Sequence, residues 1–167
     1  MKILVTGFTG ETNSAKILLD KIMTENKLYL ENDNNISEKQ LEKELIKGYD
    51  YLIMFGQTRK TTNDEISTLK VMNIIFETLA CKENIKYLAD WNFNFMKSHF
   101  CAAGYDVFIS EDAGIYLCNN IYFHALKLQD EIHLNLKSVF VKIPYYENIV
   151  DIDHFANTIT EYIKTLK

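Results

Sequence analysis

Cys118 is the residue whose neighbours in the sequence best suit covalent chemistry. It follows the turn-forming residues Asp112 and Gly114 in the stretch DAGIYLCN, and it opens an apolar segment that extends to about Gln129. A cysteine at a helix N-terminus lies close to unpaired N–H groups and to the positive end of the macrodipole, which stabilise a thiolate. Most free cysteines are instead small buried apolar residues, so both interpretations stay open for Cys118.

Alternating strands and helices are expected to position this cysteine. Apolar runs predict strands at 2–8, 28–30, 49–56, 85–90 and 105–110 and a last strand within 131–145, and apolar spacing predicts helices at 14–23, 37–47, 91–103, 118–129 and 152–166. This order predicts an α/β fold, a single three-layer α/β/α domain over residues 1–167 with a mostly parallel mixed sheet. Ligands bind beyond the carboxyl ends of such strands, so the loops after Phe8, Phe55 and Ser110 are expected to share one edge and the site.

The helix at 37–47 carries the clearest local signal. Ser37 and Gln40 form a capping box, Ile36 and Leu41 can form a hydrophobic staple, and Gly48 suits the position after the last turn. The sequence therefore predicts that this helix begins at Ser37.

Composition excludes several classes of protein. The chain has 167 residues, a net charge of −5 and no cluster of basic residues, which argues against a nucleic-acid partner. No apolar run approaches the length that spans a membrane, and the apolar start ILVTGF is too short for an export signal. The three cysteines have neither disulfide nor zinc-type spacing. We expect a cytoplasmic protein without a metal or cofactor.

Two motifs together resemble a known family. DAGIYLCN is followed by FVKIPY, whose lysine lies 24 residues after the cysteine. This pair resembles the signature of pyroglutamyl peptidase I, a family of cytosolic cysteine omega-peptidases with an A-G-T-[FY]-x-C-N motif around the nucleophile and a later F-[IV]-H-[IV]-P-Y strand that carries the catalytic histidine. MKILVTGF and YLIMFGQ resemble the family's opening and its strand before the G-G-R turn, so the resemblance covers most of the chain in order.

The resemblance implies a role for four residues. Cys118 falls on the nucleophile. Glu65, counted from Arg59 as the arginine of the G-G-R turn, falls on the acidic residue that orients the base. Phe8 falls on the first-loop aromatic that packs against the pyroglutamyl ring, and Gln57 falls in the loop whose backbone holds the lactam.

The chain departs from the family pattern at three places. Lys142 stands where the family has its catalytic histidine. Ile75 stands where the family has an arginine near the active site, and the first loop, TGFTGETNS, lacks the second phenylalanine and the Gly-Gly of the family's G-F-x-P-F-G-G. The base and part of the substrate pocket are therefore replaced.

Lys142 is expected to be a poor substitute for histidine. Histidine, with an ordinary pKa of about 6.5, both protonates a leaving amine and activates water near neutral pH, whereas a lysine amine titrates near about 10.4. Glu65, expected nearby, would hold the lysine as an ammonium, beside which a thiolate remains favourable. His124 lies six residues after Cys118, about 240° around a helix, and so faces elsewhere; His99, His133 and His154 read as core-rim, surface or cap residues.

Two functions remain open. The first is a pyroglutamyl-peptidase-I-like cysteine hydrolase that removes N-terminal pyroglutamate from peptides through Cys118, Glu65 and Lys142, with activity that is weak or lost. The second is a catalytically degenerate relative that binds a small lactam, a peptide end or a protein partner. The resemblance and the exposed aromatics predict self-association into a homo-oligomer, with no nucleic-acid or membrane partner.

Overall fold

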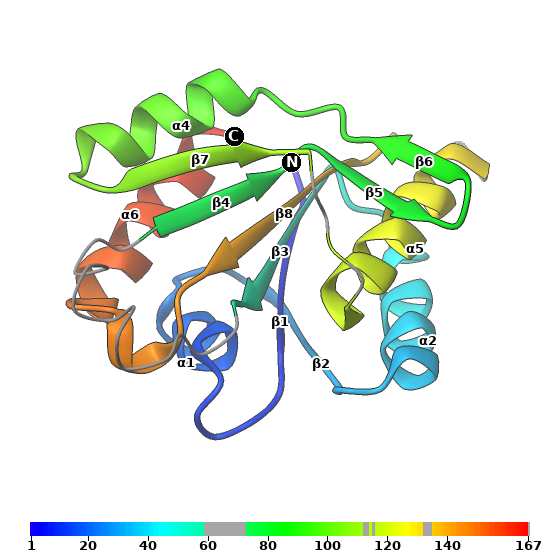
Figure 1. Ribbon diagram of the computed structural model, residues 1–167, viewed down its shortest axis with the longest axis horizontal. Helices are drawn as coiled ribbons and strands as arrows, with labels where there is room; N and C mark the ends of the chain where they lie inside the picture. Colours follow the sequence, from blue (N-terminus) through cyan, green and yellow to red (C-terminus); the bar gives the residue numbers. More distant parts are fainter. Residues whose placement is uncertain (59–72, 112–113, 115, 132–134, 167) are drawn as a thin grey trace.

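A computed structural model describes residues 1–58, 73–111, 114, 116–131 and 135–166 of the chain. Strands and helices alternate along much of its length (Figure 1). The strands are β1 (Ile3–Phe8), β2 (Asn26–Leu30), β3 (Tyr51–Gln57), β4 (Asn73–Glu77), β5 (Leu79–Lys82), β6 (Ile85–Leu88), β7 (Asp106–Ser110) and β8 (Lys137–Ile143). The helices are α1 (Ser14–Lys21), α2 (Asn34–Leu45), α4 (Phe93–Ala102), α5 (Leu117–Glu131) and α6 (Ile152–Thr165), with a short 3-10 helix at Tyr146–Asn148.

Six strands form the central sheet in the order β2-β1-β3-β8-β4-β7. Neighbouring strands run parallel except β8 and β4, which are antiparallel. Helices α1, α4 and α6 cover one face and α2 and α5 the other (Figure 1). Side chains of successive strand residues enter the two cores alternately, as Ile53 and Met54 do, because a strand has a period of two. This confirms the three-layer α/β/α fold with a mostly parallel mixed sheet.

Helix α2 begins earlier than the capping box predicts. Asp33 is the N-cap residue, and its side chain accepts a hydrogen bond from the Ile36 N–H at 3.0 Å. Ser37 lies buried inside the helix, and Gln40 accepts from the Glu31 N–H instead. The prediction was wrong because Asp33, three residues before Ile36, offers an equally good capping oxygen at a position that adds a further turn.

The segment between β3 and α4 contains strands that the sequence patterns did not predict. β4 enters the central sheet between β8 and β7, and β5 follows it after one residue. The predicted strand at 85–90 is present as β6, but it pairs with β5 in a separate two-stranded sheet. Short strands of four or five residues carry too little periodicity to be separated from loops in the sequence.

The direction of β4 overturns one prediction about the sheet edge. β7 is parallel to β4, and β4 is antiparallel to β8, which is parallel to β3. The loop after Ser110 therefore leaves the sheet at the edge opposite to the loops after Phe8 and Phe55. The apolar pattern of a strand is the same in either direction, so the sequence could not reveal this reversal.

Candidate active site around Cys118

Cys118 lies in the first turn of α5, with its sulfur against the backbone of β3. A Cβ atom built on Gly56 would lie 2.8 Å from Cys118 Sγ and 2.5 Å from Phe140 Cζ. Both distances are shorter than real Cβ contacts allow. Glycine at position 56 thus leaves the space that the sulfur and the Phe140 ring occupy.

Strand register brings Lys142 to the same place. Gly56 on β3 pairs with Lys142 on β8, and Lys142 pairs in turn with Ile75 on β4. Phe140, two residues before Lys142, belongs to the core on the α5 side, so Lys142 points to that side as well. The structure therefore brings Cys118 and Lys142 together on one face of the sheet.

Lys142 forms an ion pair with Glu77. Nζ of Lys142 lies 2.6 Å from Oε1 of Glu77, and the two side chains are 21% and 2% exposed. Glu77 pairs with Phe140 in the antiparallel register, which places it diagonally from Lys142 on the same face. The other carboxylate oxygen, Oε2, is buried and has no hydrogen-bond partner within the described residues. A carboxylate in such surroundings is stable only beside a cation, because an unpaired buried charge is costly.

Glu77 is the site residue that sequence reasoning missed. The expected acidic residue, Glu65, and the arginine from which it was counted, Arg59, lie outside the described residues. A signal for Glu77 existed in the stretch NIIFE, where one acid ends an apolar run, because such an acid requires a partner if the run is buried. Tyr122 of α5 donates a hydrogen bond to the Glu77 carbonyl oxygen at 3.1 Å and fastens the helix to this strand.

Desolvation favours the neutral form of the partly buried Cys118 thiol. Burial raises its pKa from the ordinary 9.0 to about 11, although the Lys142 ammonium and a backbone hydrogen bond act in the opposite direction; the Glu77 carboxylate adds to the increase. Of the two interpretations of Cys118, this favours the small apolar residue over the thiolate, because desolvation of the sulfur outweighs the nearby positive charges. The thiol must therefore lose its proton to a base before this sulfur can act as a nucleophile.

Phe8 and Gln57 have structural contacts in addition to any binding role. Phe8 is 3% exposed and belongs to the core on the α5 side. Oε1 of Gln57 accepts hydrogen bonds from Ser14 N (2.7 Å) and lies 2.6 Å from Ser14 Oγ. The same hydroxyl lies 2.6 Å from the Pro144 carbonyl oxygen. Gln57 thus fastens the first turn of α1 to the end of β3, and Ser14 links both to the residue that follows β8.

Asn119, the residue after the cysteine, holds the β5–β6 hairpin against α5. Its Nδ2 donates to the Cys81 carbonyl oxygen at 2.6 Å, and its Oδ1 accepts from the Cys81 N–H at 3.1 Å. The side chain is buried and imitates one more strand residue beside β5. Asn119 therefore connects the start of α5, where Cys118 lies, to the β5–β6 hairpin.

The histidines in the described residues all contact other parts of the molecule. His124 Nε2 lies 3.0 Å from Glu42 Oε1 on α2. His99 lies 3.0 Å from the Thr158 carbonyl oxygen, and His154 lies 3.2 Å from that of Ala103 while its ring stacks on Tyr105. His133 lies outside the described residues. No imidazole in the described part of the chain accompanies Cys118.

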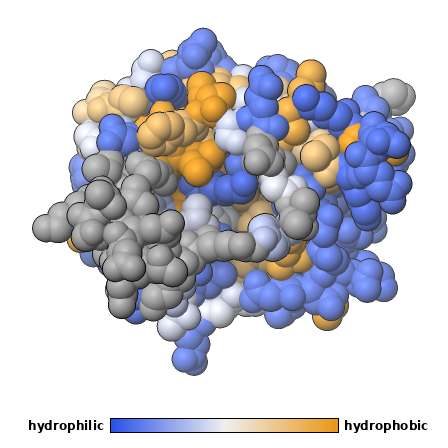
Figure 2. Space-filling model, in the orientation of Figure 1, coloured by the Kyte–Doolittle hydropathy of each residue, from blue (hydrophilic) through white to orange (hydrophobic). Residues whose placement is uncertain are grey.

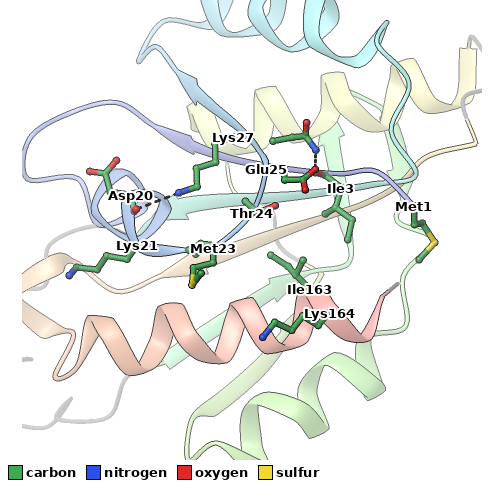
Figure 3. Close-up of a pocket in the computed structure, with 12 residues that line it drawn as sticks. Met1, Ile3, Asp20, Lys21, Met23, Thr24, Glu25, Lys27, Ile163 and Lys164 are labelled. Atoms are coloured by element: carbon green, nitrogen blue, oxygen red, sulfur yellow. Dashed lines mark hydrogen bonds between the residues drawn. The ribbon is translucent and has the colours of Figure 1, made fainter.

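A hollow in the surface lies far from the cysteine. It measures about 530 Å³ and is lined by the start of β1 and the ends of α1 and α6 (Figure 3). Ile3 begins β1 there, whereas Gly56 lies at the other end of the neighbouring β3.

Within the described residues, no group of three or more metal-binding side chains forms a cluster, and no helix is long and apolar enough to cross a membrane.

Comparisons with known proteins agree on one family. The model of the family described as pyroglutamyl peptidase matches residues 58–160. The chain is 27% identical over 168 residues to the pyrrolidone-carboxylate peptidase of Fusobacterium nucleatum subsp. nucleatum, across 86% of this chain and 78% of that protein.

Solved structures of such peptidases share the fold. A mutant pyrrolidone carboxyl peptidase from the hyperthermophile Pyrococcus furiosus has a TM-score of 0.76 and 18% identity over 98% of this chain and 97% of its own. Pyroglutamyl peptidase I of Bacillus amyloliquefaciens has a TM-score of 0.76 and 14% identity over 96% and 94%. Because the family match includes both β8, with Lys142, and the cysteine at the start of α5, the chain belongs to the pyroglutamyl peptidase family.

Proposed function

We propose that this chain is a slow cysteine hydrolase that removes N-terminal pyroglutamate from peptides. In the reaction, Sγ of Cys118 attacks the carbonyl carbon of the pyroglutamyl residue and forms a thioester as the peptide amine leaves. Water then releases pyroglutamate and restores the thiol. Membership in the family and the position of Cys118 beside Gly56 of β3 support this proposal.

The ion pair between Lys142 and Glu77 is the observation from which we expect a slow reaction. An ammonium held 2.6 Å from a carboxylate has no free electron pair with which to take the thiol proton. The raised pKa of the Cys118 thiol adds to this, since few molecules carry the thiolate near pH 7. Activity should therefore increase with pH, as the thiolate becomes more abundant.

The other proposed site residues follow from the family resemblance. Glu65 would orient the proton-transfer group, Phe8 would lie behind the pyroglutamyl ring, and the backbone beside Gln57 would hold the lactam. Because Phe8 is almost fully buried and the first loop is short, the ring would contact little of the aromatic surface that the family pattern implies.

The same ion pair favours a second candidate function, binding without turnover. A neutral thiol and a paired lysine form a site that can hold a pyroglutamyl peptide end or a small lactam while no group drives the acyl transfer. In that case, the protein would be a binding module of the same specificity.

Release of a chromophore from a pyroglutamyl-linked substrate between pH 7 and 10 tests the proposal. We expect slow release by the wild type that increases with pH and is abolished in Cys118→Ser. Lys142→His combined with Glu77→Ala should raise the rate at pH 7, because an imidazole without a buried acid can act as the base. If the wild type binds pyroglutamyl peptides but releases no chromophore up to pH 10, the hydrolase proposal is wrong and the protein binds these peptides without turnover.

A further inference from the structure

A continuous row of side chains crosses the sheet beside Cys118. Gly56 pairs with Lys142, Lys142 with Ile75, and Ile75 with Phe108 of β7. Residues that are register partners in neighbouring strands project to the same face, so all members of this row face the α5 side. We call Ile75 and Phe108 the apolar shelf. It begins next to the Cys118–Lys142 corner and ends at the edge of the sheet.

The apolar shelf is open to solvent. Phe108 is 54% exposed, and Ile75 is partly exposed. β7 is the outermost strand of the sheet, with β4 as its neighbour. Figure 2 shows hydrophobic surface gathered over β4 and β7. An exposed aromatic ring that continues from a candidate active site is typical of a ligand-binding surface.

The order of the strands determines which part of a peptide reaches the shelf. Phe8 ends β1 and Gln57 ends β3, so the lactam ring is expected on the β1–β3 side of Cys118. The attacked bond then lies at the sulfur, beside Gly56. The rest of the peptide continues away from the ring, and that direction crosses β8, β4 and β7 in turn.

We propose that the apolar shelf binds the side chains of the residues that follow pyroglutamate and that it selects peptides with aromatic or aliphatic side chains there. This inference rests on the proposed function, because it assumes a pyroglutamyl peptide at Cys118. It assigns Ile75 and Phe108 as specificity-determining residues.

The dimensions suit the second and third residues of such a peptide. Neighbouring strands lie about 4.8 Å apart, which places Ile75 roughly 10 Å and Phe108 roughly 14 Å from Gly56 along the row. An extended peptide advances about 3.3 Å per residue, and a phenylalanine side chain adds several ångströms to its reach. The second residue can therefore reach Ile75, and the third can reach Phe108.

Binding of pyroglutamyl peptides to the Cys118→Ser protein tests the inference directly. The probes are the amides of pGlu-Ala-Ala, pGlu-Phe-Ala and pGlu-Ala-Phe, and calorimetry measures each dissociation constant. We expect the phenylalanine peptides to bind about tenfold more tightly than pGlu-Ala-Ala, as burial of part of one aromatic ring would provide. In wild type, the same preference should appear in kcat/KM.

Two variants of the shelf and one matched control locate the effect. Ile75→Ala should reduce the preference for pGlu-Phe-Ala to about twofold or less, and Phe108→Ser should do the same for pGlu-Ala-Phe. Ile109→Ser is the control, because Ile109 is also exposed, at 40%, on the same strand but projects to the opposite face. Far-UV circular dichroism verifies that each variant is folded, and Ile75→Ala tests the shelf if Phe108→Ser does not fold.

The outcomes separate this inference from the proposed function. Equal affinity for the three peptides, or a preference that survives both shelf variants, overturns the shelf and leaves a pyroglutamyl site intact. An equal loss in Ile109→Ser also overturns it. Absence of binding and turnover with every peptide overturns the proposed function, and the shelf with it.

Discussion

The Cys118 corner and the rim of the hollow at the opposite end of the sheet each have a lysine–carboxylate pair of the same length. Lys142 and Glu77 lie 2.6 Å apart beside Cys118, and Lys16 lies 2.6 Å from Asp20, which lines the hollow. Glu77 is 2% exposed, whereas the side chains of Lys16 and Asp20 are 37% and 45% exposed. Distance alone would rank the two pairs as equal.

Burial makes the two regions behave differently. Water screens the pair at the hollow, so its charges can separate at little cost. At the Cys118 corner, water hardly reaches the Glu77 carboxylate, and burial also raises the pKa of the thiol. The hollow measures about 530 Å³, but the corner is where burial affects the protonation of a side chain.

The largest contrast should appear in the reactivity of the thiols. Because burial raises the pKa of the Cys118 thiol to about 11, only a small fraction is ionised at pH 7, and this fraction increases with pH. We expect the rate of alkylation of Cys118 by iodoacetamide to increase accordingly from pH 7 to 10, as measured by mass spectrometry of peptides. Exposed Cys81 and Cys101 serve as internal references and should react first at pH 7. Labelling of Cys118 at pH 7 as fast as that of Cys81 would contradict a buried neutral thiol.

Removal of one partner of the buried pair should have the next largest effect. Glu77→Ala leaves the Lys142 ammonium largely buried without its carboxylate, and we expect a loss of about 3 kcal/mol in the free energy of unfolding. Urea denaturation measures this loss. The double variant Glu77→Leu with Lys142→Met should recover to within about 1 kcal/mol of wild type, since it removes both charges. If the double variant is no more stable than Glu77→Ala, the loss does not come from an unpaired charge.

Gly56→Ala should have a smaller effect that concerns the corner alone. The added Cβ would meet Phe140 and the Cys118 sulfur, so that β3, the ring or α5 must shift, and we expect a loss of about 2 kcal/mol. Gly48→Ala is the matched control, because nothing lies within 4 Å of its Cβ and it costs only about 1 kcal/mol for a left-handed backbone at φ +73°. Alkylation of Cys118 should change in Gly56→Ala and stay as in wild type in Gly48→Ala. Unchanged alkylation in both variants would show that the sulfur does not depend on the space at Gly56.

Much of this corner could be predicted from the sequence, and the rest depends on packing. Cys118 at a helix start and Lys142 near the end of a strand are local patterns, and a family resemblance joined them. Glu77 could not be assigned, because its role depends on an unpredicted strand, β4, and on the direction in which β4 meets β8. A strand pattern identifies the buried face but neither the neighbouring strand nor its direction.

The protonation of Cys118 shows the same limit. The N-terminus of a helix lowers the pKa of a thiol, and this effect can be inferred from the sequence. Burial between Gly56 and Phe140 raises it by more, and this effect arises only when α5, β3 and β8 assemble. The sequence therefore predicts the position of Cys118 at the start of a helix but not the pKa of its thiol.

The exposed pair at the hollow should give the smallest effect. Lys16→Gln removes its contact with Asp20 one helical turn later, and we expect a loss of about 0.4 kcal/mol at low ionic strength, which 1 M NaCl abolishes. The hydrogen bond from Lys16 is the main cause that lowers the pKa of Asp20 below its ordinary 3.8. The pair therefore contributes stability above pH 3.8 and loses this contribution as the pH falls through the lowered pKa. Urea denaturation of wild type and variant at pH 7 and pH 3 measures both trends. A salt-independent loss of 2 kcal/mol or more would mean that this pair, too, is controlled by burial, and equal distance would then suffice to predict equal strength.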